Sequence, residues 1–284
     1  MYISVVIPAY NLLEDCISAL SPSVQQPDCE YEVIVSDDKR NSGTKQLLED
    51  KYAWAIWVEG PHKGVAANRN NGVKYAHGEW IVFIDNDCIP DKSLINNYIN
   101  AVQNNPNILV FEGCIKPNRP KKHFLEEAPI NEVGGYFWTC NVMIQRDYFV
   151  NVLHGFDEDF YMYGEDVDIR ERIKQTNQPI IFIKEAYCIH PWRIPKDILN
   201  LARQKRISSI PLYFKHPHLR GKKSLYTTIK NELRFYIKDV LFHTIPYRGR
   251  GLFTYIHLHI IANKSIKKEE WEYKNNEKEW TKFY

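Results

Sequence analysis

An apolar stretch that ends in two carboxylates constrains the fold of this 284-residue chain more than any other feature. Residues 80–84, Trp-Ile-Val-Phe-Ile, are aromatic and β-branched, which favours a buried strand. Asp85, Asn86 and Asp87 follow at once, and their poor strand propensity predicts that the chain leaves the sheet there. In an open α/β sheet, ligands bind at the carboxyl ends of strands. The pair Asp85 and Asp87 therefore predicts a divalent-cation site, although a lone Asp-x-Asp also suits a simple turn.

Strands and helices alternate along the first half of the chain. Strands are expected at residues 3–7, 31–36, 55–58, 80–84 and 108–113, and helices at 13–20, 44–52, 64–76 and 92–103. After a looser stretch at 115–135, we expect a strand at 137–145, a short helix at 146–152, a helix at 165–174 and a last short strand at 179–183. This alternation predicts an α/β fold with a mostly parallel, Rossmann-like sheet flanked by helices.

The charge of the chain changes sign along its length. Residues 1–195 carry 18 Lys and Arg against 27 Asp and Glu, whereas residues 196–268 carry 16 against 3. The basic part is also rich in aromatic residues and has a helical pattern. We therefore predict two domains, an acidic catalytic domain at 1–195 and a basic helical extension at 196–284.

The cysteines and the hydropathy pattern bear on location. Six cysteines occur without C-x-x-C spacing, and the N-terminus lacks the pattern of a signal peptide. No apolar run approaches the 18 residues typical of a membrane span. These features predict reduced thiols in a cytoplasmic protein, either free or peripheral on the cytoplasmic face of the membrane.

Three acidic sites are expected to converge. Asp37-Asp38, Asp85-x-Asp87 and Glu165-Asp166 each stand where a predicted strand or loop ends. Since parallel strands bring their carboxyl ends to one edge of the sheet, these groups would share one crevice. Such a negative crevice suits a metal–diphosphate ligand, in which the cation offsets the charge of the carboxylates and the phosphates.

Five segments, in this order, resemble the motifs of family 2 glycosyltransferases with the GT-A fold. They are VVIPAYN (5–11), EVIVSDD (32–38), GVAANRNNG (64–72), GEWIVFIDND (78–87) and GFDEDFYMYGEDVD (155–168). The resemblance covers roughly residues 3–192. It implies the GT-A (nucleotide-diphospho-sugar transferase) fold and an inverting transfer of sugar from a nucleotide-sugar, with a UDP-sugar as the expected donor.

The resemblance assigns the chemistry to a few acidic residues and one histidine. Asp166 is the implied catalytic base, which takes the proton of the acceptor hydroxyl. Asp87 would ligate Mn²⁺ or Mg²⁺, and Asp85 would face either this metal or the ribose. His190, just after the last strand, is the implied third metal ligand, whereas taken alone it suits a buried structural histidine equally well.

Further residues are implied to bind the nucleotide-sugar. Asp38 would accept a hydrogen bond from the nucleobase imide, and Arg69 would reach the nucleotide unless it is an ordinary solvated arginine. The remaining implied binding residues are Pro8, Ala9, Tyr10, Gly64, Asn86 and Glu165. The alternative for Glu165 is a purely structural role, because an acidic residue in the first turn stabilises a helix N-terminus.

Two other residues near these motifs are given structural interpretations. Cys88 is unusual beside the metal motif and is interpreted as a small packing residue. Asp168 and Arg170 are expected to form an ion pair.

The expected partners follow from the implied activity and from the basic segment. We expect a nucleotide-sugar donor, a glycan or lipid-linked acceptor in surface polysaccharide assembly, and hexosyl or N-acetylhexosaminyl transfer. Residues 196–268 suit either a helical appendage with a solvated basic face or a platform on an anionic membrane surface. No nucleic acid is expected, because no recognised reading module accompanies the charge. The alternatives are a non-catalytic lipid- or partner-binding protein with a structural metal site, and a sugar-phosphate nucleotidyltransferase.

Overall fold

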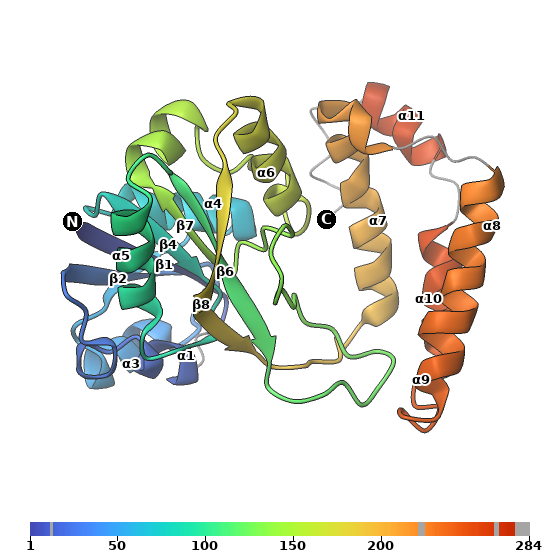
Figure 1. Cartoon of the computed structure of the whole chain (residues 1–284), viewed down its shortest axis with the longest axis horizontal. Helices are drawn as coiled ribbons and strands as arrows, with labels where there is room; N and C mark the ends of the chain where they lie inside the picture. Colours follow the sequence, from blue (N-terminus) through green and yellow to red (C-terminus); the bar gives the residue numbers. More distant parts are fainter. Residues whose placement is uncertain (12–13, 221–224, 264–266, 276–284) are drawn as a thin grey trace. The chain divides into compact units, whose positions relative to one another are not determined.

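The computed structural model describes residues 1–11, 14–220, 225–263 and 267–275, and it divides into two compact units (Figure 1). The first unit comprises Met1–Asn118 and Pro129–Pro191, and the second comprises Arg119–Ala128 and Trp192–Tyr284. These units differ from the predicted division at residue 195 by the segment 119–128 and by residues 192–195. The predicted two-domain organisation itself stays a prediction, and residues 221–224, 264–266 and 276–284 of the predicted extension lie outside the described residues.

A mixed eight-stranded sheet forms the centre of the first unit. Its strands are β1 (Tyr2–Ala9), β2 (Glu30–Asp37), β3 (Ile56–Glu59), β4 (Trp80–Ile84), β5 (Ile89–Pro90), β6 (Val110–Pro117), β7 (Asn141–Gln145) and β8 (Ile180–His190). They lie in the order β3-β2-β1-β4-β7-β6-β8-β5. The pairs β2–β3, β1–β2, β1–β4 and β6–β8 are parallel, whereas β7 is antiparallel to both of its neighbours and β5 is antiparallel to β8. This is the predicted α/β fold with a mostly parallel sheet.

The direction of the strands decides which residues meet. Because β7 runs antiparallel to both β4 and β6, strand β6 points in the same direction as β4, and β8 is parallel to β6. The carboxyl ends of β2, β4 and β8 therefore lie at one edge of the sheet. Asp38, Asp85 and His190, which stand at or next to these ends, reach that edge from distant parts of the sequence.

Helices cover both faces of the sheet. Those of the first unit are α1 (Glu14–Ala19), α2 (Pro22–Gln25), α3 (Thr44–Lys51), α4 (Val65–Lys74), α5 (Leu94–Asn104), the π-helical turn η1 (Tyr148–Val152) and α6 (Glu165–Gln175). Side chains of α1, α3 and α5 share one apolar core with the sheet, and side chains of α4, η1 and α6 share the other. Strand residues alternate between the two cores, as for Val5 and Val6, because neighbouring side chains of a strand point to opposite faces.

The described part of the second unit is mainly helical. Its helices are α7 (Ile198–Lys215), η2 (Pro217–Arg220), α8 (Leu225–Arg234), η3 (Phe235–Leu241), α9 (Phe242–Thr244), α10 (Leu252–Ala262) and α11 (Lys267–Asn275). The helical character predicted beyond residue 195 is thus confirmed for the described residues. None of the described helices combines the length and the apolar character that crossing a membrane requires.

Three of the strand predictions were wrong in extent. The strand expected at 108–113 begins at Val110 and continues to Pro117. The strand expected at 137–145 begins only at Asn141, after a residue with positive φ at Phe137. The strand expected to stop at 183 continues as β8 to His190. The pairing with β6 skips from Ile183 to Tyr187, so a bulge at Lys184–Ala186 interrupts the apolar pattern without ending the strand. The helix predicted from Leu13 begins at Glu14 in the described chain, since residues 12 and 13 lie outside it.

Candidate active site

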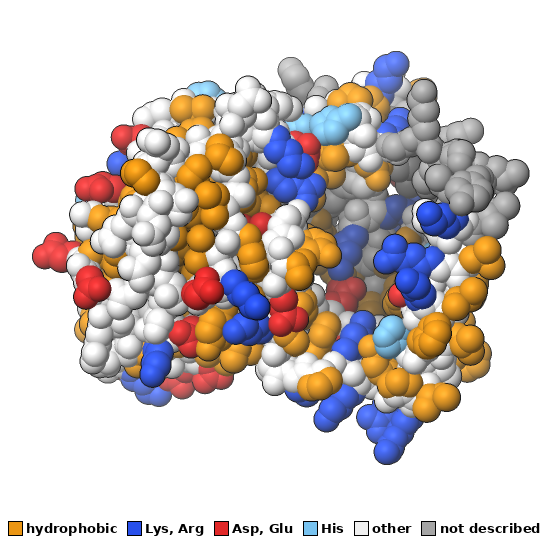
Figure 2. Space-filling model, viewed as in Figure 1, with side chains coloured by type: hydrophobic (Ala, Val, Ile, Leu, Met, Phe, Trp, Pro, Cys, Tyr) orange, Lys and Arg blue, Asp and Glu red, His pale blue; other side chains and the backbone are white. Residues whose placement is uncertain are grey.

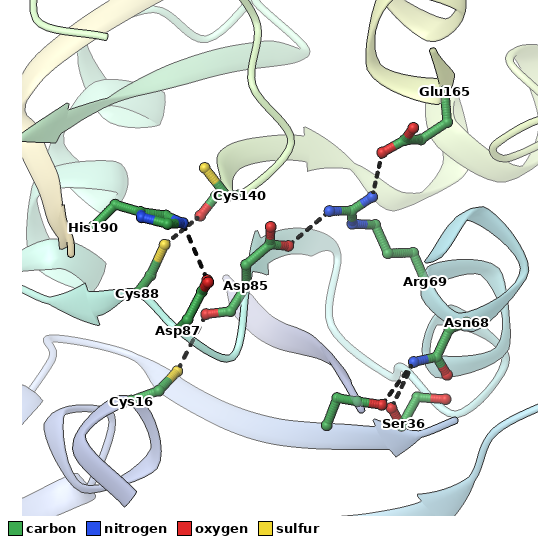
Figure 3. A network of polar contacts seen from close by, with 11 residues as sticks. Cys16, Ser36, Asn68, Arg69, Asp85, Asp87, Cys88, Cys140, Glu165 and His190 are labelled. Atoms are coloured by element: carbon green, nitrogen blue, oxygen red, sulfur yellow. Dashed lines mark hydrogen bonds and ion pairs between the residues drawn. The ribbon is translucent and has the colours of Figure 1, made fainter. Parts of the chain in front are cut away.

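A tight turn after β4 sets the position of Asp87. The backbone N–H of Cys88 donates to the carbonyl of Asp85 at 3.0 Å, which turns the chain back immediately. The two residues of β5 then pair antiparallel with Cys188 and Ile189 of β8. This pairing brings the end of β8 against the turn, and His190 Nε2 lies 3.2 Å from Asp87 Oδ1 (Figure 3). Two of the three residues that the family resemblance implied as metal ligands, Asp87 and His190, are therefore neighbours.

The hydrogen bonding of His190 orients a lone pair toward Asp87. Its Nδ1 lies 2.9 Å from the carbonyl oxygen of Pro191, and since a carbonyl can only accept, Nδ1 carries the proton. With the proton on Nδ1, the ring in its neutral form presents the lone pair of Nε2, and this atom is buried and forms no hydrogen bond. A lone pair and a carboxylate oxygen that face each other repel unless a cation lies between them.

The chemistry of this pair fits a divalent cation. Two ligand atoms at about 2.2 Å from an ion and at right angles to each other would be about 3 Å apart, close to the separation of Nε2 and Oδ1. A ligating histidine commonly donates its other N–H to a backbone carbonyl, as His190 does to Pro191. Asp87 and His190 would hold such an ion. Asp85, the other predicted ligand, is bonded elsewhere, and its metal role stays a prediction.

Arg69 links two of the acidic motifs. Its guanidinium donates to Asp85 Oδ1 at 2.7 Å and to Glu165 Oε1 at 2.9 Å (Figure 3). The side chain is only 2% exposed, so it is not the solvated arginine of the alternative reading. Burial lowers the pKa of Arg69, but the two carboxylates raise it, and the net pKa is above the ordinary value. The prediction that Arg69 binds nucleotide is not tested by these contacts.

Glu165 and Asp166 begin α6 beside this arginine. Burial and the adjacent Asp166 raise the pKa of Glu165 to about 7, although Arg69 opposes the shift. Burial also raises the pKa of Asp166. The hydrogen bond that the Val167 N–H donates to it at 2.7 Å and the charge of Arg69 lower this pKa, but burial outweighs them. A carboxylate with a raised pKa is a stronger base than an exposed one, which is the property that the implied role of Asp166 requires.

The loop before α6 is fixed to the start of α4. Asn70 donates to the carbonyl of Phe156 and accepts from its N–H, both at 2.8 Å. The Val65 N–H donates to the carbonyl of Tyr161 at 3.0 Å. Gly64 precedes α4 with φ of +91°, and a Cβ there would lie 2.2 Å from Tyr161 O, so only glycine fits. These contacts place the first turn of α6 near the sheet edge that carries Asp85.

Asp38 lies beyond β2, and its carboxylate is held by backbone donors. One oxygen accepts from the His62 N–H and the other from the Gly64 N–H at 3.1 Å. Each oxygen keeps a further lone pair, so the carboxylate can still accept the imide hydrogen bond predicted for it. That role stays a prediction.

The other predicted binding residues also lie near the carboxyl ends of the strands. Pro8 and Ala9 end β1, and Tyr10 follows with 63% of its surface exposed. Asn86 donates from its amide to the carbonyl of Asn11, which ties the turn after β4 to the turn after β1. The structure thus brings these segments together, while their contact with a ligand is not tested.

Comparison with known proteins identifies the family. The sequence profile described as "Glycosyl transferase family 2" matches residues 4–153, more than half of the chain. The chain belongs to glycosyl transferase family 2. The resemblance of the motifs to this family is therefore confirmed.

Individual relatives and structures agree with this assignment. "Uncharacterized glycosyltransferase YfnE" of Bacillus subtilis is 27% identical over 254 residues, which cover 67% of this chain and 64% of the relative. A "Poly(ribitol-phosphate) beta-glucosyltransferase" of Bacillus spizizenii is 32% identical over 140 residues, 45% of this chain and 22% of the relative. The chain thus spans less than two thirds of the length of these curated relatives. The crystal structure of S. aureus TarS 1–349 in complex with UDP-GlcNAc has a TM-score of 0.56 at 18% identity, covering 97% of this chain and 92% of that one, and it confirms the GT-A fold.

Two features of the site were not foreseen. Cys88, interpreted as a packing residue, has its sulfur within 4.8 Å of ligand atoms of both Asp87 and His190. The ion pair expected between Asp168 and Arg170 was wrong, because Asp168 pairs with Arg172 at 2.8 Å. Residues four apart lie on the same side of a helix whereas residues two apart do not, so the helical spacing alone would have indicated Arg172.

Proposed function

We propose that this family 2 glycosyltransferase transfers a hexosyl or N-acetylhexosaminyl group from a UDP-sugar to an acceptor hydroxyl, with inversion, in surface polysaccharide or glycan assembly. One observation carries the proposal. The buried His190 and the partly exposed Asp87 lie at the same sheet edge as Asp85, which Arg69 connects to Glu165 at the start of the helix that carries Asp166.

The residues of this edge divide the work of the reaction. Asp87 and His190 would hold Mn²⁺ or Mg²⁺, which when bound offsets the negative charge of the diphosphate leaving group. Asp166 takes the proton of the attacking hydroxyl, and its partly buried position keeps the carboxylate basic. Arg69 holds Asp85 and Glu165 in place, so the two acidic motifs keep a fixed separation.

A UDP-sugar is the proposed donor for two reasons. Asp38 retains the acceptor capacity that a uracil imide requires, and the structurally similar TarS was solved with UDP-GlcNAc.

A thermal-shift screen of UDP-, GDP- and dTDP-sugars with manganese tests this choice of donor. Donor at 100 times its Kd stabilises the folded state by about 2.7 kcal/mol. Stabilisation by UDP-sugars alone supports the proposal, and an equal response to all three nucleotides, or only to GDP- or dTDP-sugars, contradicts it.

We propose that the acceptors are lipid-linked molecules and that an anionic membrane surface is the docking partner of the second unit. Its helices expose large apolar side chains beside exposed basic ones, and Figure 2 shows both kinds together on one face of this unit. The most exposed apolar residues described in this unit are Leu241 (66%), Phe242 (66%), Ile245 (86%), Phe253 (86%) and Trp271 (66%). Lys238, Arg248 and Arg250 are close in sequence to the first four and are also exposed. Apolar side chains flanked by cations suit the interface of an anionic bilayer.

Liposome flotation of the whole chain tests this surface. We expect recovery with vesicles that contain anionic lipid, reduced recovery with neutral vesicles, and a loss for a Phe242→Ser/Phe253→Ser double variant. The matched control is Val133→Ser, which changes an apolar residue of the first unit with 78% exposure. Equal recovery with neutral and anionic vesicles would contradict the proposal.

A further inference from the structure

Cys88 stands where a third ligand to the proposed ion would stand. Its sulfur and ligand atoms of Asp87 and His190 all lie within 4.8 Å of one another, and among the described residues this is the one such group of three. In Figure 3 the Cys88 side chain lies beside the His190 ring. The sulfur donates weakly to the carbonyl of Cys140 at 3.7 Å and also interacts with the thiols of Cys140 and Cys188, weak contacts that a metal–sulfur bond would readily replace.

The surroundings of this group exclude water on one side. Cys88 and His190 are 0% and 1% exposed, whereas Asp87 is partly exposed, with 12% of its side chain accessible. An ion bound here would therefore be held by the protein on its inner side and open toward solvent on the side of Asp87. His190 Nε2, buried and without a hydrogen-bond partner, is a second and independent sign of a ligand at this place.

The combination of donor atoms is informative. Mn²⁺ and Mg²⁺ prefer oxygen ligands, whereas imidazole and especially sulfur ligands favour zinc-like ions. A carboxylate oxygen, an imidazole nitrogen and a thiolate sulfur are the three kinds of donor that Zn²⁺ takes from proteins, and three protein ligands with an open fourth position is the arrangement of catalytic zinc sites. Ligation would replace the S–H proton of Cys88, which leaves to solvent as the metal–sulfur bond forms.

We infer that Cys88, with Asp87 and His190, makes this site bind thiophilic divalent cations, Zn²⁺ and Co²⁺, more tightly than Mn²⁺. The inference rests on the Asp87–His190 pair of the proposed function but does not require sugar transfer. Zn²⁺ already exceeds Mn²⁺ in intrinsic affinity for such ligands, and the sulfur adds to this preference. The identity of the bound ion then depends on the relative concentrations of free zinc and manganese.

Cobalt absorption spectroscopy tests the sulfur ligand directly. Titration of the full chain with Co²⁺ should produce a near-ultraviolet thiolate-to-cobalt charge-transfer band, and Cys88→Ser should abolish it. Cys114→Ser is the matched control, because Cys114 is equally buried but its charged neighbours are Lys116, Glu132, Lys184 and Glu185 rather than the site aspartates. Circular dichroism checks that the variants fold, and Cys88→Ala provides a second substitution.

Affinity measurements separate this inference from the proposed function. By chelator competition, Cys88→Ser should weaken Zn²⁺ binding by at least the roughly 10–100-fold that loss of an outer-shell partner costs, while Mn²⁺ affinity changes far less. Co²⁺ binding without a thiolate band, or a band that survives in Cys88→Ser and disappears in Cys188→Ser, would overturn the role of Cys88. A cobalt band in a protein that neither binds Mn²⁺ nor cleaves nucleotide-sugars would support the zinc-type site and overturn the proposed function. Absence of Co²⁺, Zn²⁺ and Mn²⁺ binding would overturn both.

Discussion

Replacement of Arg69 by methionine should destabilise the protein strongly at alkaline pH. Methionine fills a similar volume but removes the positive charge that lies between two carboxylates. Arg69 is 2% exposed, and its partners Glu165 and Asp85 are 9% and 29% exposed, so water would screen the remaining negative charges poorly. A contact of the guanidinium with the Phe156 ring, centred 5.6 Å away, is also lost.

The size of the effect follows from the cost of a buried charge without its partner. Removing one member of a buried ion pair costs about 3–5 kcal/mol. For a protein of this size, 1 kcal/mol corresponds to roughly 2–4 °C in Tm, so the expected loss is on the order of 10 °C at pH 8. At pH 5 the loss should be smaller. Without Arg69 the pKa of Glu165 rises above its already raised value of about 7, so this carboxyl is neutral at pH 5 and needs no partner.

Thermal melting followed by circular dichroism at pH 5 and pH 8 measures both effects. Arg40→Met serves as the matched control, since Arg40 is exposed in the turn after β2 and should leave Tm nearly unchanged. The reasoning fails if Arg69→Met lowers Tm at pH 8 by no more than Arg40→Met does. It also fails if the loss is larger at pH 5 than at pH 8.

Two further predictions concern the same edge of the sheet. The pKa of Glu165 is raised from 4.5 to about 7, so the folded state holds more protons than the unfolded state between these values, and its stability should fall as pH rises from about 4.5 to 7. Glu165→Gln should flatten this decline in urea-unfolding experiments, and an unchanged slope would count against it. Gly43→Ala, with φ of +80° and open space, should cost about 1–2 kcal/mol from backbone strain alone. Gly64→Ala should cost more than Gly43→Ala because its Cβ also meets the Tyr161 backbone, and equal losses would show that the close approach is unimportant.

The parts of the fold that depend on local pattern were predictable. The strand at 80–84 has an uninterrupted apolar run, and the helices at 44–51 and 165–175 begin and end close to where the spacing predicts. Strand β8 was misjudged because Lys184 and Glu185 interrupt its apolar run, and a bulge is set by pairing with β6 rather than by local sequence. Tertiary pairing, not propensity, decided that strand.

The site shows the same division between local and tertiary information. The pairing of Asp87 with His190 was anticipated from the family resemblance, because strand order carries both to one edge. The bridge from Arg69 to Asp85 and Glu165 joins residues up to 96 positions apart, and no spacing rule reports such a contact. Cys88 was interpreted from its residue type alone, whereas its position depends on the turn after β4 and on the β5–β8 pairing.

The release of UDP from a UDP-sugar in the presence of Mn²⁺, compared between the parent protein and Asp166→Asn, tests the central claim most directly. Asp147→Asn, an exposed aspartate outside the site, is the matched control. The account predicts manganese-dependent release that Asp166→Asn slows by roughly 10²–10⁴-fold, the usual contribution of a general base, and that Asp147→Asn leaves intact. Release by Asp166→Asn at the parental rate would contradict the assignment of the base, and with it the proposed chemistry of this edge of the sheet.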